Sequence, residues 1–242
     1  MRFLGKIILL TGALTLGPLP AFGQSFDKAS QAYIKGDYAV AVEHLKTLSD
    51  LGYATAQFNL GTMYNDGLGV AQNYSEAVQW YSLAAEQGNA LAQSNLGFMY
   101  QDGLGVAQNY NEAVQWYSLA AEQGNAPAQS NLGFMYYEGL GIPQNYSEAA
   151  QWYSRAAEQG HGSAHHQLGL MYYKGEGVSQ NPVMAYMLNI LAAAQGHEGG
   201  RNNRDIILKV LSREQVAEGQ QLATEWRVGT PLPSFDDFST WP

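Results

Sequence analysis

A ten-residue stretch that recurs at a fixed interval is the feature that most constrains this chain. Trp80–Asn89 returns almost letter for letter at Trp116–Asn125 and, with small changes, at Trp152–His161. Both intervals are 36 residues. Self-similarity at a period of about 20 to 50 residues is typical of solenoids, in which each repeat buries its apolar face only against its neighbours. The sequence therefore predicts an array of stacked repeats.

Four copies of the pattern follow one another, and each predicts a pair of helices that we call A and B. The copies begin at Ala54, Ala90, Ala126 and Gly162. In helix A of the first copy, Ala56, Leu60 and Met63 lie at the spacing of one helical face, which predicts a buried stripe. Apolar residues recur in the same way in helix B over residues 77–85, with a Trp–Tyr pair at the centre. These rings are expected to pack on alanine-rich neighbouring helices.

Start and stop signals frame the helices. Asn73 and its counterparts one and two periods later each precede a Glu by three residues, which is an N-cap pattern for helix B. Gly88 supplies the left-handed residue that ends this helix. Gly61 lies beside the buried stripe of helix A and costs about 1 kcal/mol of helix propensity, so its recurrence in every copy predicts close approach of helix B. Truncating a buried ring, as in Trp116→Ala, is expected to cost about 3–5 kcal/mol.

The segments that flank the repeats are expected to be helical as well. Residues 24–53 are interpreted as a divergent helical pair that caps the array. Residues 198–228 are expected to form two capping helices, a short one over 203–211 and a longer one that opens with a Ser212 capping box and runs to Trp226. The repeats between them occupy residues 54–89, 90–125, 126–161 and 162–197. In the fourth copy, Tyr186 and Met187 are predicted to replace the Trp–Tyr pair.

The last residues, 229–242, are interpreted as a tail. Its composition fits a disordered end. It also fits a linear motif whose three aromatic residues dock in a groove, with self-docking on this protein as one option.

The N-terminus has the organisation of a secretory signal peptide over residues 1–23. Two basic residues precede an apolar run that extends to about Leu16, and Ala21-Phe22-Gly23 forms a small-x-small cleavage site before Gln24. The apolar run is shorter than the roughly 20 residues of a membrane span, which favours cleavage over an uncleaved anchor. No other segment approaches a span, so a periplasmic or secreted protein is expected. The chain has no cysteine, which excludes a disulfide framework and a lipid-modified N-terminal cysteine.

The chain is strongly acidic. It carries 12 Lys and Arg against 21 Asp and Glu, and removal of Arg2 and Lys6 with the signal peptide leaves a net charge of −11. Like charge repels nucleic acid and anionic lipid, so neither is expected as a partner. A basic protein or peptide is favoured instead.

The motif of the repeat resembles the Sel-one-like repeat (SLR) family, a relative of tetratricopeptide repeats. From Ala54 to Gly88 it has Ala-x-Ala-Gln-x-x-Leu-Gly-x-Met-Tyr, then Gly-x-Gly-Val-x-Gln-Asn-Tyr-x-Glu-Ala, then Trp-Tyr-x-x-Ala-Ala-Glu-Gln-Gly. The resemblance covers about residues 54–197. It implies an all-α fold, an α/α right-handed superhelical solenoid of about twelve helices, with helix A on the concave side. It also implies an adaptor of multiprotein assemblies, often in the bacterial envelope.

No loop or carboxylate pattern in the chain predicts catalysis. The loop Asp66–Gln72 contains two glycines, but it joins two helices and lacks the Lys-Ser/Thr of a phosphate-binding loop. Glu86, Glu122 and Glu158 recur together with their helix, as scaffold residues do. A cysteine-rich branch of the resembled family is associated with β-lactam binding or hydrolysis, and this chain lacks those cysteines. We therefore expect no catalytic residue and no cofactor.

A local histidine cluster is the remaining candidate for chemistry. His161 precedes the helix that carries His165 and His166, and no nearby Asp, Glu or Cys completes a metal site. His165 stands where the other copies have glutamine, so we interpret it as a substitute for a structural amide. No metal is expected.

The exposed side of helix A is the predicted binding site. It combines amides, which offer a donor and an acceptor to a peptide backbone, with aromatic anchors. The residues on this concave face are Phe58, Asn59 and Thr62 in the first copy, Ser94, Asn95 and Phe98 in the second, Ser130, Asn131, Phe134 and Tyr137 in the third, and His166, Gln167, Leu170 and Tyr173 in the fourth. An alternative stays open, in which the amides bond to adjacent helices and only orient the stack.

These observations predict a non-catalytic adaptor that binds a protein or peptide on its concave face. Two alternatives remain. One is an enzyme or binder directed at the cell wall or at β-lactams, and the other is a structural spacer.

Overall fold

The computed structural model describes residues 20–233, which form twelve α-helices and no strand. The all-α repeat architecture predicted from the sequence is thereby confirmed. Within the described residues, no helix has both the length and the apolar character that a bilayer span needs. Most of the predicted signal peptide and the last nine residues of the predicted tail lie outside the described part.

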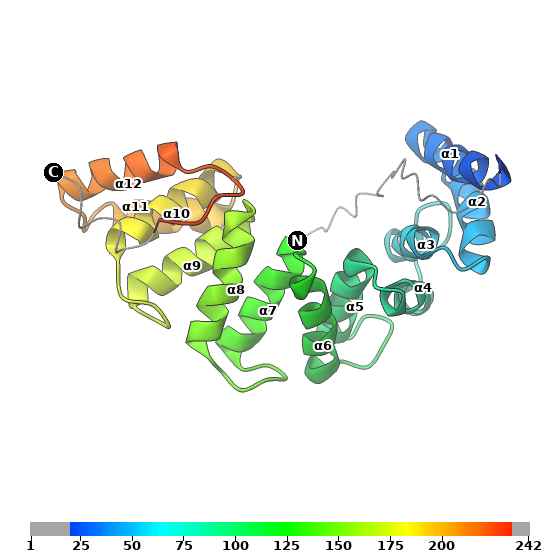
Figure 1. The fold of residues 1–242 in the computed structure, drawn as a ribbon, viewed down its shortest axis with the longest axis horizontal. Coiled ribbons are helices and arrows are strands. Elements are labelled where there is room, and N and C mark those ends of the chain that lie inside the picture. The colour runs from blue at the N-terminus through cyan, green and yellow to red at the C-terminus, as the bar shows by residue number, and fades with distance from the viewer. Residues whose placement is uncertain (1–19, 234–242) are drawn as a thin grey trace. The chain divides into compact units, whose positions relative to one another are not determined.

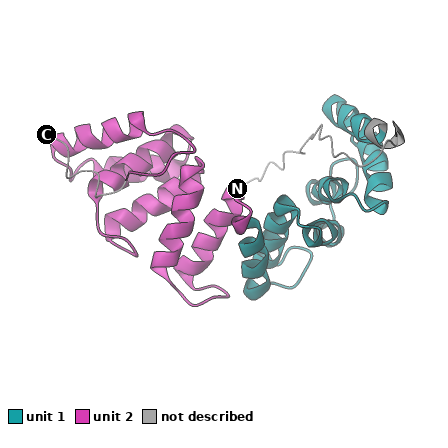
Figure 2. Ribbon diagram, in the orientation of Figure 1, with its two compact units in different colours: residues 1–120 teal, residues 121–242 magenta. Residues whose placement is uncertain are grey.

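The helices form two compact units, residues 1–120 and residues 121–242 (Figure 2). The first unit contains α1 (Pro20–Lys35), α2 (Tyr38–Asp50), α3 (Ala54–Asp66), α4 (Tyr74–Glu86), α5 (Ala90–Asp102) and most of α6 (Tyr110–Glu122). The second contains α7 (Ala126–Glu138), α8 (Tyr146–Glu158), α9 (Gly162–Lys174), α10 (Pro182–Ala194), α11 (Glu198–Ile207) and α12 (Arg213–Glu225). The A helices of the four copies are α3, α5, α7 and α9, and the B helices are α4, α6, α8 and α10.

In the first unit, each helix from α1 to α5 packs against its neighbours in sequence (Figure 1). One cluster of buried side chains joins α1, α2 and α3 around Leu45, Leu48 and Leu60. A second joins α3, α4 and α5 around Tyr81 and Leu96. Helix α3 contributes to both clusters, as expected when each repeat buries its apolar face on the next.

In the second unit, α7, α8, α9 and α10 pack in the same sequential way, and α11 and α12 both lie on α10 (Figure 1). Buried residues of α8, α9 and α10 form one cluster around Tyr153 and Leu168. Tyr186 of α10 and Ile207 of α11 form another, against which Val216 of α12 packs. The last two helices thus cover α10, whose outer side has no further repeat.

The predicted helix boundaries follow from caps that the structure contains. The Asn73 side chain accepts a hydrogen bond from the Glu76 N–H at 3.1 Å. Gly88 follows α4 with φ +85°, which is a left-handed conformation that glycine adopts without strain. Ser212 and Gln215 form the predicted capping box at the start of α12, since each side chain bonds the other's backbone N–H.

The recurring glycine of helix A makes room for a tyrosine ring of helix B. A Cβ atom at Gly61 would lie 2.7 Å from Cδ1 of Tyr81, and Gly97 stands in the same relation to Tyr117. The predicted close approach is therefore present. The buried member of the pair is the tyrosine, because Tyr117 is 0% exposed whereas Trp116 is partly exposed at the edge of the cluster. The expectation of a buried tryptophan is corrected accordingly.

In the fourth copy the register of helix B differs from the prediction. Leu188 and Asn189 occupy the positions of the Trp–Tyr pair, one period after Trp152 and Tyr153, so the assignment to Tyr186 and Met187 was wrong by two residues. Gly169 of α9 faces the Asn189 amide. The Tyr186 ring packs instead on Gly219 of α12, where an added Cβ would lie 2.7 Å from Cδ1. The capping helix thus repeats the glycine–tyrosine contact of the array.

The short helix α11 also begins earlier than predicted, at Glu198 rather than at residue 203. The His197 side chain caps it by accepting the Gly200 N–H at 3.2 Å, and two glycines in its first turn concealed it in the sequence. Gly200 is needed there because a Cβ atom would lie 2.6 Å from that of Ala192.

The glycine-rich loops serve the stacking of repeats. A Cβ atom at Gly105 would lie 2.3 Å from the carbonyl carbon of Tyr74, at the start of helix B of the preceding copy. Ser75 donates a hydrogen bond to the Gly105 carbonyl at 3.2 Å. The second glycine of the loop therefore lets one repeat touch the next, which agrees with a structural rather than a phosphate-binding role.

Candidate binding face of the A helices

Most residues of the predicted binding face are partly exposed, but not all of them. Asn95 and Phe98 on α5 and the residues on α7 and α9 keep part of their surface, apart from Ser130. The partly exposed set comprises Asn95, Phe98, Asn131, Phe134, Tyr137, His166, Gln167, Leu170 and Tyr173. Five predicted residues are buried instead: Phe58, Asn59, Thr62, Ser94 and Ser130.

The burial of the first-copy residues has a direct cause in Tyr81. The Phe58 ring lies 6.0 Å from the Tyr81 ring. Thr62 accepts a hydrogen bond from the Tyr81 hydroxyl at 3.2 Å. These side chains therefore face helix B of their own copy, and the expectation that they present surface to a partner was wrong. In the second unit, the candidate face is carried by α7 and α9.

The amides of the predicted face also make contacts within the stack of helices. Asn59 is buried, and its Oδ1 has no hydrogen-bond partner. Burial raises the pKa of Tyr81 to about 12, and its hydrogen bonds with Thr62 and with Asn95 of the next copy oppose that rise. Asn95 thus lies beside a tyrosine hydroxyl of the preceding repeat, as the alternative interpretation of the amides expects.

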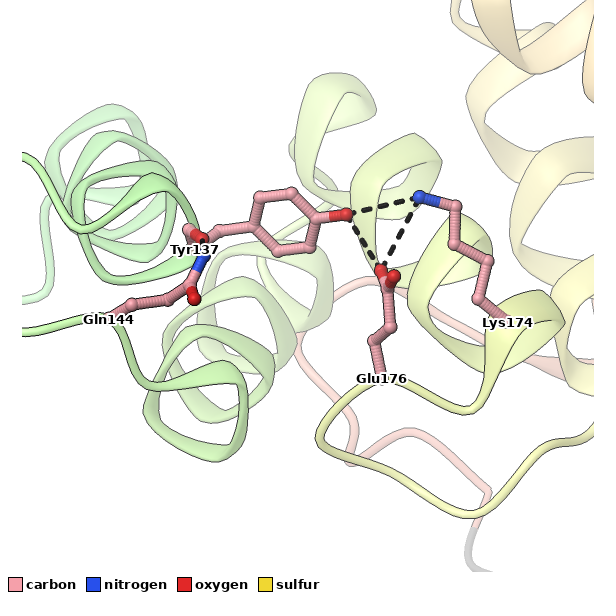
Figure 3. A network of polar contacts seen from close by, with 4 residues as sticks. All are labelled: Tyr137, Gln144, Lys174 and Glu176. Atoms are coloured by element: carbon pink, nitrogen blue, oxygen red, sulfur yellow. Dashed lines mark hydrogen bonds and ion pairs between the residues drawn. The ribbon is translucent and has the colours of Figure 1, made fainter.

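Tyr137, predicted as an apolar anchor, takes part in a polar cluster between α7 and the loop after α9 (Figure 3). Its hydroxyl donates to Glu176 Oε2 at 2.7 Å and accepts from Lys174 Nζ at 3.1 Å. Lys174 and Glu176 also form an ion pair at 3.4 Å. The backbone carbonyl of Tyr137 accepts from Gln144 at 2.8 Å. The side chain therefore links the third and fourth copies.

The contacts of this cluster shift the pKa values of its tyrosine and of its lysine. Burial, followed by the hydrogen bond to Glu176, raises the pKa of Tyr137. The hydrogen bond to Tyr137 raises the pKa of Lys174. At neutral pH the tyrosine is therefore neutral and the lysine is charged.

The histidines of the fourth copy separate into two environments. His165 is 0% exposed, and its Nδ1 lies 3.3 Å from Gln195 Nε2, as Gln57 Oε1 lies 2.7 Å from Gln87 Nε2 in the first copy. It therefore replaces the structural glutamine in this contact, and burial lowers its pKa to about 4. His166 faces Asn189 Oδ1 at 3.2 Å. No group of three or more metal-ligating side chains occurs among residues 20–233.

One of the three recurring glutamates has a role that the sequence did not indicate. Glu86 and Glu122 are exposed. Glu158 accepts two backbone hydrogen bonds from the segment after α12, at its carbonyl from Gly229 and at its carboxylate from Leu232. The only sequence signal for this contact was the change to glycine and proline from Gly229 onward, which was interpreted as a tail that is either disordered or docked in a groove.

The repeat motif of this chain matches the Sel1 repeat family at residues 54–89, 90–125, 126–161 and 162–197. The chain belongs to the Sel1 repeat family. The match covers more than half of the chain and confirms the resemblance that the sequence showed. A comparison with curated proteins gives no match.

Solved structures of other Sel1 repeat proteins are similar to this one. A Sel1 repeat protein from Oxalobacter formigenes is 38% identical, with a TM-score of 0.70 and 80% of each chain covered. A protective antigen present in uropathogenic Escherichia coli strains, which displays an SLR fold, is 35% identical with a TM-score of 0.72, and the match covers 84% of this chain and 46% of the antigen. A Sel1 repeat protein from Klebsiella pneumoniae, at 21% identity and a TM-score of 0.51, shares the fold.

Proposed function

We propose that this Sel1 repeat protein is an exported, non-catalytic adaptor that binds a protein or peptide on the A-helix face. Its strongest support is the regular spacing of partly exposed amides and apolar side chains on α7 and α9. Asn131 and Phe134 on α7 recur one period later as Gln167 and Leu170 on α9. Amides bond to a peptide backbone, and apolar side chains between them provide anchors.

The charge of the chain supports a basic partner. The net charge of the whole chain is −9 at pH 7, and only 12 Lys and Arg are present. An acidic surface accelerates the association of a basic partner and slows that of nucleic acid. Affinity for such a partner is expected to fall as salt rises.

The binding face is tested by replacing Asn131, Phe134, Gln167 and Leu170 together with alanine. The variant should lose at least about tenfold in affinity for a partner captured by the unchanged protein, because buried anchors carry most of the binding energy. Affinity capture with mass spectrometry identifies the partner, and titration calorimetry measures its affinity.

A matched control replaces Gln79, Gln115 and Gln151, which are exposed on the B helices, with alanine. Equal affinity of the control and of the unchanged protein is expected. If the face variant keeps full affinity while its helicity is intact, the assignment of the face is wrong. Failure of the unchanged protein to retain any partner would favour a spacer.

The enzymatic alternative has its own assay. Turnover of a chromogenic β-lactam or of purified peptidoglycan by the purified protein would contradict the non-catalytic proposal.

Export is proposed from the N-terminal sequence. The helix α1 begins at Pro20, so cleavage after Gly23 would remove its first four residues, which is about one turn. N-terminal sequencing of protein recovered from the periplasm should give Gln24 as the first residue. Retention of Met1 in a membrane fraction would indicate an uncleaved anchor instead.

A further inference from the structure

The segment after α12 folds back onto the turn between α8 and α9. We call residues 226–232 the strap. The Gly229 N–H donates to the Glu158 carbonyl at 2.7 Å, and the Leu232 N–H donates to Glu158 Oε1 at 3.2 Å. Leu232 also packs against the buried cluster of α8, α9 and α10. The strap thus crosses the end of helix B in the third copy.

Two more side chains of the strap have defined positions on this turn. A Cβ atom at Gly160 would lie 3.0 Å from Val228 Cγ2, so valine covers the glycine. The Trp226 ring meets His165 edge to face, with 5.3 Å between ring centroids. We call Glu158, Gly160 and His165 the seat of the strap.

The contacts of the strap are those of a bound peptide. The carbonyl of Glu158 is one of the last four of α8, which have no partner within the helix. The Gly229 N–H of the strap supplies that partner, while side chains at three positions of the strap contact the seat and the core beside it. Main-chain hydrogen bonds combined with spaced side-chain contacts are the general pattern of peptide recognition.

The seat differs from the corresponding turns of the other copies. The glycines at those turns, Gly52, Gly88, Gly124 and Gly196, have no atom within 4 Å of an added Cβ. The fourth copy also departs from the repeat at this place. His165 replaces the glutamine that the other three copies have at this position, whereas His161 recurs one period later as His197 and the position of Ser163 differs in every copy. The sequence therefore changes at the turn where the strap lies.

Much of the strap remains exposed. Val228 remains 66% exposed, and Arg227, Gly229, Thr230 and Pro231 are exposed as well. The strap is attached to the rest of the second unit by hydrogen bonds from two of its backbone N–H groups and by three side chains. A segment that offers the same contacts from another protein can therefore compete, although the strap has the advantage of being tethered.

We propose that the seat is a second binding site of this protein, for a segment of a partner that turns as residues 227–230 do, and that the strap is its built-in competitor. The partner segment that the seat accepts begins with an aromatic residue. A β-branched residue follows two positions later, a glycine comes directly after it, and an aliphatic residue lies three positions beyond the glycine. This spacing is that of Trp226, Val228, Gly229 and Leu232. The site lies at a helix–helix turn and does not depend on the proposed A-helix face.

The test uses full-length protein and a fluorescently labelled peptide of residues 226–233 as probe. Leu232→Ala, alone and with Trp226→Ala, weakens the strap without touching the seat. Fluorescence anisotropy should show at least about tenfold tighter peptide binding to the double variant than to the unchanged protein. The single variant should lie between them, and it keeps the test valid if the double variant does not fold.

Glu158→Ala in the strap-weakened protein should weaken peptide binding at least about fivefold, because it removes the acceptor of the Leu232 N–H. Glu86→Ala in the same background is the matched control at the equivalent exposed turn, and it should leave binding unchanged. Peptide binding no tighter than that of a scrambled peptide, in a strap-weakened variant with intact helicity, would overturn the proposal. Equal loss in the Glu86 and Glu158 variants would overturn it too, because binding would then not be specific to the seat.

Discussion

At the scale of single residues, the tyrosine of helix B carries the packing of each repeat. Tyr117 is 0% exposed and its hydroxyl donates to Gln101 Oε1 at 2.9 Å. The neighbouring Trp116 is only partly buried, at the edge of the cluster around Tyr81 and Leu96. A fully enclosed ring loses more transfer free energy on truncation than a ring at the margin, and it leaves a larger cavity.

Truncation of these two rings should therefore have unequal effects. Tyr117→Ala is expected to lower the free energy of unfolding by about 3–5 kcal/mol, and Trp116→Ala by about 1–2 kcal/mol. Chemical denaturation followed by circular dichroism measures both. A larger loss for Trp116→Ala would restore the expectation drawn from the sequence and contradict the burial described here.

The buried His165 makes stability depend on pH. Burial lowers its pKa to about 4, and the ordinary pKa of histidine is 6.5. Unfolding therefore takes up a proton between these values, so stability should be constant above pH 6.5 and should fall as the pH drops toward 4. The total loss from this group is about 3 kcal/mol.

The measurement compares urea unfolding of the unchanged protein and of His165→Gln at several pH values between 7.5 and 4. Glutamine is the residue of the other copies at this position, so the variant should fold and should lose this part of the pH dependence. His44→Gln, on α2, is the control. An identical pH profile for His165→Gln and the unchanged protein would exclude this group as the cause.

At the scale of helices, the approach of A and B depends on one glycine in each pair. An added Cβ at Gly61 would lie 2.7 Å from the Tyr81 ring, which is itself enclosed by α3, α4 and α5. Gly61→Ala is expected to destabilise the protein by about 1–3 kcal/mol, although alanine favours a helix by about 1 kcal/mol. Thermal unfolding tests this, with Gln115→Ala on the exposed side of α6 as a control that should change little.

Stabilisation by Gly61→Ala would show that the tyrosine ring can move aside. The higher helix propensity of alanine would then outweigh the contact with the ring at residue 61.

At the scale of the molecule, stability in a repeat array depends on contacts between neighbouring repeats. The last repeat has α11 and α12 on its outer side, and α12 places Gly219 against the Tyr186 ring. Removal of residues 213–242 should therefore raise hydrogen exchange in α9 and α10 and leave α1 to α3 unchanged, because local openings depend on nearby contacts. Exchange measured by mass spectrometry would contradict this if protection fell equally along the whole chain.

The sequence alone determined the helical class, the four copies and most helix ends, since these depend on local properties. Periodic apolar residues predict the buried faces, asparagine caps and left-handed glycines mark the boundaries, and both repeat every 36 residues. The fourth copy shows the limit of this reasoning. Tyr186 was assigned to the position of the Trp–Tyr pair because it is aromatic. A strict period of 36 residues places Leu188 and Asn189 at that position instead.

Only the tertiary structure decided which side chains of the A helices reach the surface and where the C-terminal segment lies. Phe58 and Thr62 share the helical face of the partly exposed residues, but a tyrosine from another helix covers them. The strap has no periodic pattern, and the bond from Leu232 to Glu158 joins residues 74 positions apart. Such contacts depend on which surfaces the folded elements bring together, and the spacing of residues along one helix does not contain that information.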